Sequence, residues 1–96
     1  MKVLQHRVRF HEVDAQRIVF NAHYLTWCDH AAYEFFRLAG WSPLDLEAQE
    51  FDFVVRKAFL DYQRAAVLDD LLDIEVVVKR VGRTSFDLVF TVLREE

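Results

Sequence analysis

The fold is decided by the stretch YLTWCDHAAYEFFRLA, residues 24–39, in which apolar side chains recur at intervals of three and four. This spacing places them on one face of a helix, whose period is about 3.6 residues. The apolar face comprises Tyr24, Leu25, Cys28, Ala31, Ala32, Phe35, Phe36 and Ala39. The opposite, polar face comprises Thr26, His30, Glu34 and Arg37. Asn21 suits the N-cap and Gly40 the position just past the C-terminus, so both ends of the helix are marked.

A second, short helix is predicted directly after the first. Ser42 is a suitable cap, Pro43 fits the first turn, and Asp45 is placed to complete a capping box. The two helices therefore follow each other with only a brief connection.

Alternation of apolar and polar residues predicts strands on both sides of the helices. Residues 3–10 alternate modestly, whereas residues 74–79 and 86–92 alternate clearly and predict an antiparallel hairpin. Residues 51–62 also have a period of two, but the parity of their apolar positions changes, which requires a bulge or bend near residues 56–58. The order of elements predicts an α+β domain in which an antiparallel sheet covers one long helix.

Composition restricts the classes of protein to which the chain can belong. Its 96 residues, 53% of them hydrophobic, predict a single domain spanning residues 1–96 with a packed core. The formal net charge of -4 argues against a general attraction to nucleic acid or anionic lipid. With Cys28 as the single cysteine, neither an intrachain disulfide nor a zinc site with paired cysteines can form. This favours a reducing, cytoplasmic location.

Neither a membrane span nor a metal site is expected. Nowhere is there an apolar stretch long enough to cross a bilayer, and the N-terminus turns polar too early for a signal peptide. His6, His11, His23 and His30 show no compact metal-ligand spacing. The chain is therefore expected to work without a bound metal.

The run VRFHEVDAQRIVFNAHY, residues 8–24, resembles the signature of the 4-hydroxybenzoyl-CoA thioesterase group of hotdog proteins, including its Tol-Pal-associated members. The segments FVVRK, LDY, LDD and GRTS, at residues 53–57, 60–62, 68–70 and 82–85, resemble the family in order and spacing. The resemblance implies a hotdog fold, a long helix wrapped by an antiparallel sheet, assembled into homodimers or homotetramers. It also implies an acyl-coenzyme A substrate and no cofactor.

Two features depart from the family pattern. The turn after the family's catalytic aspartate usually contains glycine, whereas Gln16 and Arg17 occupy it here, so a positive φ would strain Arg17. Family members also continue with further strands past the position of Glu96, so the sheet is expected to lack its final strands and to leave an open edge.

The resemblance assigns catalysis to Asp14. Two roles remain open for its carboxylate, nucleophilic attack on the thioester and activation of water as a general base. The alternative is that Asp14 merely caps a turn, as loop aspartates commonly do. Asn21 is the second catalytic candidate, because a backbone N–H at the start of a helix can polarise the thioester carbonyl. Its alternative role is simple N-capping.

Four further residues are candidates for substrate binding. His23 lies in the first helical turn, where the role of an ordinary polar residue is preferred. Arg56, Lys57 and Arg83 are basic residues that suit the phosphates of coenzyme A, although exposed charges of this kind are ordinarily just solvated.

Other conspicuous side chains have simpler interpretations. Glu34 is expected to be solvated or paired, although another branch of hotdog thioesterases uses a helical carboxylate as catalyst. Cys28 lies within the apolar stripe and is assigned to the core. Phe20, Trp27 and Trp41 suit an aromatic pocket, but residues at these spacings are more often core.

The predicted function is hydrolysis of short-chain or aromatic acyl-coenzyme A thioesters, with Asp14 as the catalytic carboxylate. Two alternatives remain. A non-catalytic hotdog module would bind acyl-coenzyme A or an acyl carrier protein without turnover, and a structural domain would have no affinity for coenzyme A.

Overall fold

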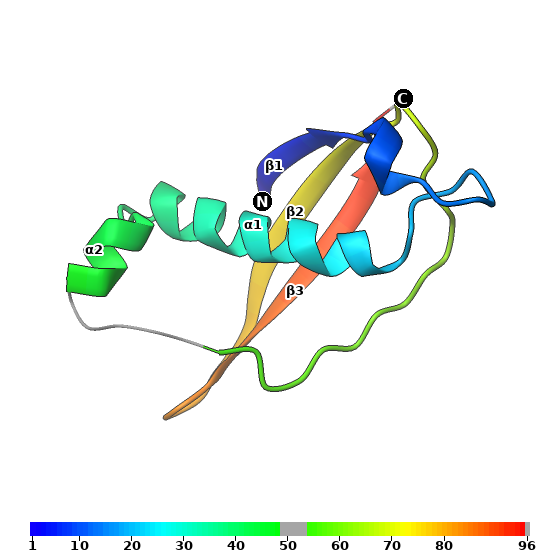
Figure 1. The fold of residues 1–96 in the computed structure, drawn as a ribbon. Helices are drawn as coiled ribbons and strands as arrows, with labels where there is room; N and C mark the ends of the chain where they lie inside the picture. The colour runs from blue at the N-terminus through cyan, green and yellow to red at the C-terminus, as the bar shows by residue number, and fades with distance from the viewer. Residues whose placement is uncertain (49–53, 96) are drawn as a thin grey trace.

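A computed structural model describes residues 1–48 and 54–95 of the chain. The elements in chain order are strand β1 (Lys2–Arg7), the 3-10 turn η1 (Phe10–Glu12), helices α1 (Ala22–Leu38) and α2 (Pro43–Ala48), and strands β2 (Leu71–Val81) and β3 (Phe86–Arg94). β2 pairs antiparallel with both other strands, so the sheet order is β1-β2-β3. Figure 1 shows α1 crossing one face of this sheet, which is the α+β arrangement that the order of elements predicts.

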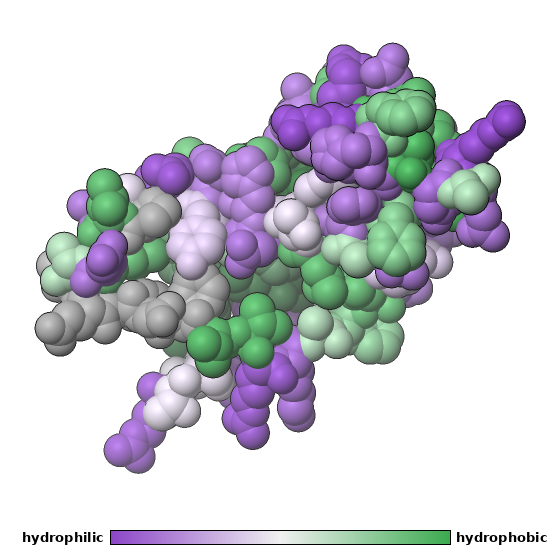
Figure 2. All heavy atoms as spheres, in the orientation of Figure 1, coloured by the Kyte–Doolittle hydropathy of each residue, from purple (hydrophilic) through white to green (hydrophobic). Residues whose placement is uncertain are grey.

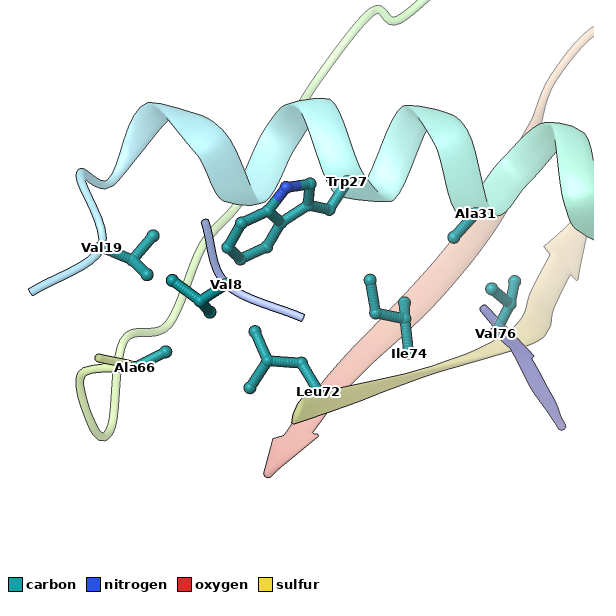
Figure 3. Close-up of a cluster of buried hydrophobic side chains, with 8 residues drawn as sticks. All are labelled: Val8, Val19, Trp27, Ala31, Ala66, Leu72, Ile74 and Val76. Atoms are coloured by element: carbon teal, nitrogen blue, oxygen red, sulfur yellow. The ribbon is translucent and has the colours of Figure 1, made fainter. Parts of the chain in front are cut away.

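The hydrophobic core lies between α1 and the sheet (Figure 3). Its buried members are Val8, Val19, Trp27, Ala31, Ala66, Leu72, Ile74 and Val76. Alternate residues of β2 supply three of them, and the same face of β3 adds half-buried side chains, because successive residues of a strand point to opposite faces. The core therefore joins the helix, the hairpin and the two loop segments that carry Val19 and Ala66.

The ends of α1 lie close to the predicted positions. Gly40 has φ +95, a region that a side chain disfavours, and its N–H donates to the carbonyl of Arg37 at 2.9 Å. The N–H of Trp41 donates to Phe36 at 2.9 Å, which completes the helix C-terminus. Asn21 occupies the N-cap position, but its backbone is already helical, and its side chain makes no capping bond within the described residues. The position of the cap is confirmed and its expected side-chain bond is absent there.

The buried face of α1 differs in part from the predicted one. Ala31 and Ala32 are buried as expected, whereas Leu25 is 45% exposed and that assignment is wrong. Trp27 is buried instead, with 4% of its surface exposed, so of its two predicted roles the core one is correct. Phe20 and Trp41, which had the same two interpretations, are both about half exposed. The buried stripe is thus centred on Trp27 and Ala31.

The short helix α2 begins as predicted. The backbone N–H and hydroxyl of Ser42 both donate to a carboxylate oxygen of Asp45 at 2.9 Å. The N–H of Asp45 donates back to the Ser42 hydroxyl at 3.2 Å. These reciprocal bonds are a capping box.

The predicted strand over residues 51–62 is not confirmed. Residues 51–53 lie outside the described part, and residues 54–62 form an extended segment that pairs with no described strand. Since residues 56–58 belong to no described strand, the bend expected there does not interrupt any strand pairing. An alternating segment forms a strand only where a neighbouring strand satisfies its backbone hydrogen bonds. Val54 and Phe59 are instead 84% and 91% exposed. Figure 2 shows that hydrophobic and hydrophilic surface are interspersed on the face of the molecule drawn there.

Candidate active site

Residues 13–19, called the Asp14 loop below, connect η1 to the segment that leads into α1. Val13 and Val19 form an isolated antiparallel bridge, and the N–H of Asp14 donates to the carbonyl of Ile18 at 2.9 Å. The N–H of Arg17 donates to the carbonyl of Asp14 at 2.9 Å and closes the tip. The loop is therefore a miniature hairpin with its own hydrogen bonds.

Arg17 adopts the left-handed backbone conformation that is expected where the family usually has glycine. Its φ is 65, so a residue with a long side chain stands where the turn favours glycine. The loop nevertheless retains its hydrogen bonds, and Arg17 forms no ion pair with the described residues. The departure from the family pattern thus places strain on the backbone without opening the loop.

The two oxygens of the half-buried Asp14 carboxylate differ in their surroundings. Oδ1 accepts the N–H of Gln16 at 2.8 Å, which is the turn-capping role expected of a loop aspartate. Oδ2 accepts no hydrogen bond from the described part of the chain. Asp14 therefore caps a turn with one oxygen and keeps the other available.

The start of α1 supplies backbone donors next to this loop in the sequence. The N–H of His23 donates to the carbonyl of Phe20 at 3.0 Å and that of Tyr24 to Asn21 at 3.3 Å. The N–H groups of Asn21 and Ala22 make no hydrogen bond to any described residue, as is usual in a first helical turn. The hydroxyl of Tyr62 donates to the carbonyl of Asn21 at 3.2 Å and holds the extended segment against this end of the helix.

A buried carboxylate lies at the base of the Asp14 loop. Glu12 is only 4% exposed. Its Oε1 accepts the N–H of Arg9 at 2.7 Å, and its Oε2 accepts the indole N–H of Trp27 at 3.0 Å. Nε2 of His6 lies 2.9 and 3.1 Å from the two oxygens. Burial opposes ionisation of this group, but the bonds from His6, Arg9 and Trp27 together hold the pKa of Glu12 below its ordinary value.

His23 lies among aromatic rings and not on an open polar surface. Its ring stacks on Trp27 with centroids 6.4 Å apart and meets Phe20 edge-on at 6.1 Å. His11 is a further edge-on neighbour at 6.4 Å. His23 is half-buried, and together with Phe20 and Trp27 it forms a group of rings beside the first turn of α1, called the aromatic wall.

The structure does not bring the basic candidates to Asp14 within one chain. Arg83 lies in the turn between β2 and β3, at the end of the sheet away from the Asp14 loop (Figure 1). Arg56 and Lys57 lie in the extended segment, and a shallow groove is lined by residues 57–59 together with 86–88 of β3. The three basic side chains are exposed.

Glu34 has the role that sequence analysis prefers, whereas Cys28 lies outside the core cluster to which it is assigned there. Glu34 pairs with Arg37 at 3.3 Å and with His30 at 3.4 Å, which confirms the paired role. Cys28 is half-buried, and burial raises the pKa of its thiol to about 11. No cluster of metal-ligating side chains occurs in the part of the chain that the structure describes.

Sequence reasoning missed Glu12. Its partners belong to β1, the segment before η1 and α1, so they meet only when the chain has folded. A glutamate in a polar run carries no local signal of burial, since charged residues are rarely buried unless paired.

Comparison with known proteins identifies the family. Residues 16–96 match the thioesterase superfamily. The acyl-CoA thioester hydrolase YbgC of Escherichia coli O6:H1 is 36% identical over 85 residues, which are 88% of this chain and 62% of that protein. Among solved structures, the gentisyl-coenzyme A thioesterase BH1999 has a TM-score of 0.91 at 26% identity, covering 98% of this chain and 76% of that chain. A probable thioesterase from Bartonella henselae has a TM-score of 0.90 at 29% identity, covering 97% and 78%.

The chain belongs to the thioesterase superfamily, a class of thioester hydrolases, and has the hotdog fold that the sequence resemblance implies. It spans less than two thirds of the length of YbgC. No helix among the described residues is long and apolar enough to cross a membrane.

Proposed function

We propose that this chain hydrolyses acyl-coenzyme A thioesters and that Asp14 is the catalytic carboxylate. The observation that carries the proposal is the asymmetry of this group. Oδ1 is held by the N–H of Gln16, whereas Oδ2 is free of the described residues, in a loop that leads into α1. A carboxylate held at one oxygen is oriented for reaction at the other.

Two chemical routes use this oxygen. In the first, Oδ2 attacks the thioester carbonyl carbon, the C–S bond breaks, and water then hydrolyses the mixed anhydride. In the second, Oδ2 takes a proton from water as the water oxygen attacks the same carbon. Either way, the leaving thiolate has a pKa of about 8.5 by analogy with cysteine, so it departs without a strong general acid.

The start of α1 supports stabilisation of the oxyanion. The N–H groups of Asn21 and Ala22 have no partner among the described residues, and the helix dipole makes them better donors to a developing negative charge. We assign this role to the backbone N–H of Asn21. The alternative role of Asn21, N-capping by its side chain, has no supporting hydrogen bond among the described residues.

The relatives and the aromatic wall support a proposal for the substrate class. YbgC is an acyl-CoA thioester hydrolase and BH1999 a gentisyl-coenzyme A thioesterase. The rings of Phe20 and His23 lie beside the first turn of α1 and suit a short aliphatic or aromatic acyl group. We propose substrates of this class.

The distant basic residues fit a site shared between two copies of the chain. Arg56, Lys57 and Arg83 are exposed and lie away from Asp14 in one copy, so a homodimer or homotetramer would let one copy bind the phosphates of a substrate that the other hydrolyses. We place this assembly in the cytoplasm, where a lone cysteine stays reduced.

The experiment follows release of free thiol from a panel of short-chain and benzoyl-type coenzyme A thioesters. The test variant is Asp14→Asn, which keeps an amide oxygen able to accept the N–H of Gln16 and so preserves the turn. The matched control is Asp61→Asn, because that carboxylate is exposed and its described contact is a 3.3 Å bond from Gln63. Circular dichroism verifies that both variants fold.

We expect Asp14→Asn to lower kcat about 100-fold or more, the range for loss of a positioned acid–base group, and Asp61→Asn to leave it unchanged. Wild-type hydrolysis that survives in Asp14→Asn would overturn the catalytic assignment. Binding of coenzyme A thioesters without hydrolysis would favour the non-catalytic module, and absence of binding would favour the structural domain.

A further inference from the structure

We propose that Glu12 is the positioning residue of the active site, fixing the Asp14 loop against β1 and α1 through its buried carboxylate. This inference rests on the proposed function of Asp14, and it assigns the role to a residue that neither the sequence pattern nor the family resemblance singles out.

The contacts of Glu12 join three parts of the chain. His6 belongs to β1, Arg9 precedes η1, and Trp27 lies one and a half turns into α1. All three approach the same carboxylate at distances between 2.7 and 3.1 Å. The side chain therefore fixes the position of the loop base relative to the helix whose first turn supplies the backbone donors.

The backbone of Glu12 continues this connection into the loop. Its carbonyl accepts the N–H of Phe20 at 2.9 Å, which closes the loop directly outside the Val13–Val19 bridge. The next bond inside that bridge joins Asp14 to Ile18. Glu12 thus forms the outermost closure of the miniature hairpin, two residues before the proposed catalytic group.

The site requires acceptors at both oxygens of Glu12. The backbone N–H of Arg9 faces Oε1 and the indole N–H of Trp27 faces Oε2, and neither donor can become an acceptor. A glutamine has one acceptor and one NH₂ group, so in either orientation its NH₂ would face one of these donors. Glu12→Gln should therefore displace either the backbone N–H of Arg9 at the base of the loop or the indole of Trp27.

The test variant is accordingly Glu12→Gln. The matched control is Glu47→Gln, which makes the same chemical change at an exposed position of α2. Trp27→Phe is a second variant that removes one donor and keeps the carboxylate, so it tests the same connection if Glu12→Gln does not fold. Glu12→Asp retains the charge and both acceptors on a shorter side chain, and it serves as the conservative variant.

Steady-state hydrolysis provides the first measurement. We expect Glu12→Gln to lower kcat about tenfold or more with KM changed less than about twofold, because the loop is displaced while the substrate contacts remain. Glu12→Asp should recover part of this loss, and Trp27→Phe should show the same pattern with a smaller loss. A purely structural role predicts a lower melting temperature with kcat unchanged in the folded fraction, and that result would overturn the proposal.

A double-mutant cycle with Asp14→Asn provides the second measurement. If Glu12 acts through Asp14, Glu12→Gln should cause no further loss of rate in the Asp14→Asn background. An equal fold-loss in both backgrounds would overturn the proposal, since the two residues would then act independently.

Amide hydrogen exchange separates this inference from the proposed function. The N–H of Asp14, bonded to Ile18, should exchange faster in Glu12→Gln than in Glu47→Gln, whether or not Asp14 is catalytic. If Asp14→Asn keeps full activity, the proposed function fails, and unchanged exchange at Asp14 would show separately that Glu12 does not hold the loop.

Discussion

The indole N–H of Trp27 donates to Oε2 of Glu12 at 3.0 Å, joining the middle of the core to the base of the Asp14 loop. Both residues are 4% exposed, so neither partner can exchange this bond for water. A bond to a buried carboxylate is among the stronger contributions a single contact makes to stability.

Replacing Trp27 by Phe should therefore lower the free energy of unfolding by about 2 to 3 kcal/mol, because the carboxylate loses a donor and the smaller ring packs less fully. Urea denaturation measures this change. Trp41→Phe is the matched control, since Trp41 is 44% exposed, and we expect a change within about 0.5 kcal/mol there. Equal effects of the two substitutions would contradict the prediction.

The lowered pKa of Glu12 predicts how stability depends on pH. Because the folded protein holds this proton less tightly than the unfolded chain does, ionised Glu12 stabilises the fold above its ordinary pKa of 4.5. That contribution is lost as the pH falls through the lower pKa of the folded state. Urea midpoints of wild type and Glu12→Gln should differ most near about pH 7 and converge toward about pH 3.

The comparison isolates Glu12 because other carboxylates with lowered pKa values, Asp45 and Asp73, are present in both proteins. A constant difference between the two proteins across the pH range would show that ionisation of Glu12 is not linked to folding.

Arg17→Gly should stabilise the chain. Arg17 has φ 65, and the left-handed conformation costs a residue with a side chain about 1 to 2 kcal/mol. Part of this gain is offset by the greater freedom of glycine in the unfolded chain, so we expect a net increase of about 0.5 to 1 kcal/mol. Thermal unfolding measures the increase, with Arg17→Ala as the control that removes the side chain and keeps the strain. An increase of the same size in the alanine variant would attribute the effect to the side chain.

Cys28 should react slowly with alkylating reagents in the folded protein. Burial raises the pKa of its thiol from 9.0 to about 11, so at about pH 8 the thiolate fraction is about 100-fold lower than in the unfolded chain. Mass spectrometry after iodoacetamide treatment, with and without denaturant, measures both rates. Similar rates would show that the thiol is accessible and its pKa ordinary.

The local elements were predictable from sequence because their signals are local. The spacing of apolar residues in α1 and the capping box of Ser42 and Asp45 involve residues within a few positions of each other, and both are confirmed. The face of α1 was predicted less well. Trp27 and Ala31 are four residues apart and share the buried face, whereas Leu25 falls outside it and is 45% exposed. The indole N–H of Trp27 can be buried there because it donates to Glu12.

The candidate site was only partly predictable. Asp14 is proposed through a family resemblance and Asn21 through its place at the start of a helix, and both residue types have ordinary structural roles at such positions. Residues 54–62 of the predicted strand are not paired with a described strand. Periodicity shows which residues alternate, but not which strand would accept and donate their backbone hydrogen bonds. Glu12 had no local signal at all, because its environment is made by distant segments.

The bond from the N–H of Gln16 to Oδ1 of Asp14 has an entropic consequence. A free aspartate samples several side-chain rotamers, and ordering it at the moment of reaction would add to the activation barrier. Here the turn restricts that rotation during folding, so under the proposed function the ordering is complete before a thioester arrives. Reaction at Oδ2 would leave the turn intact, and the carboxylate would begin each catalytic cycle in the same orientation.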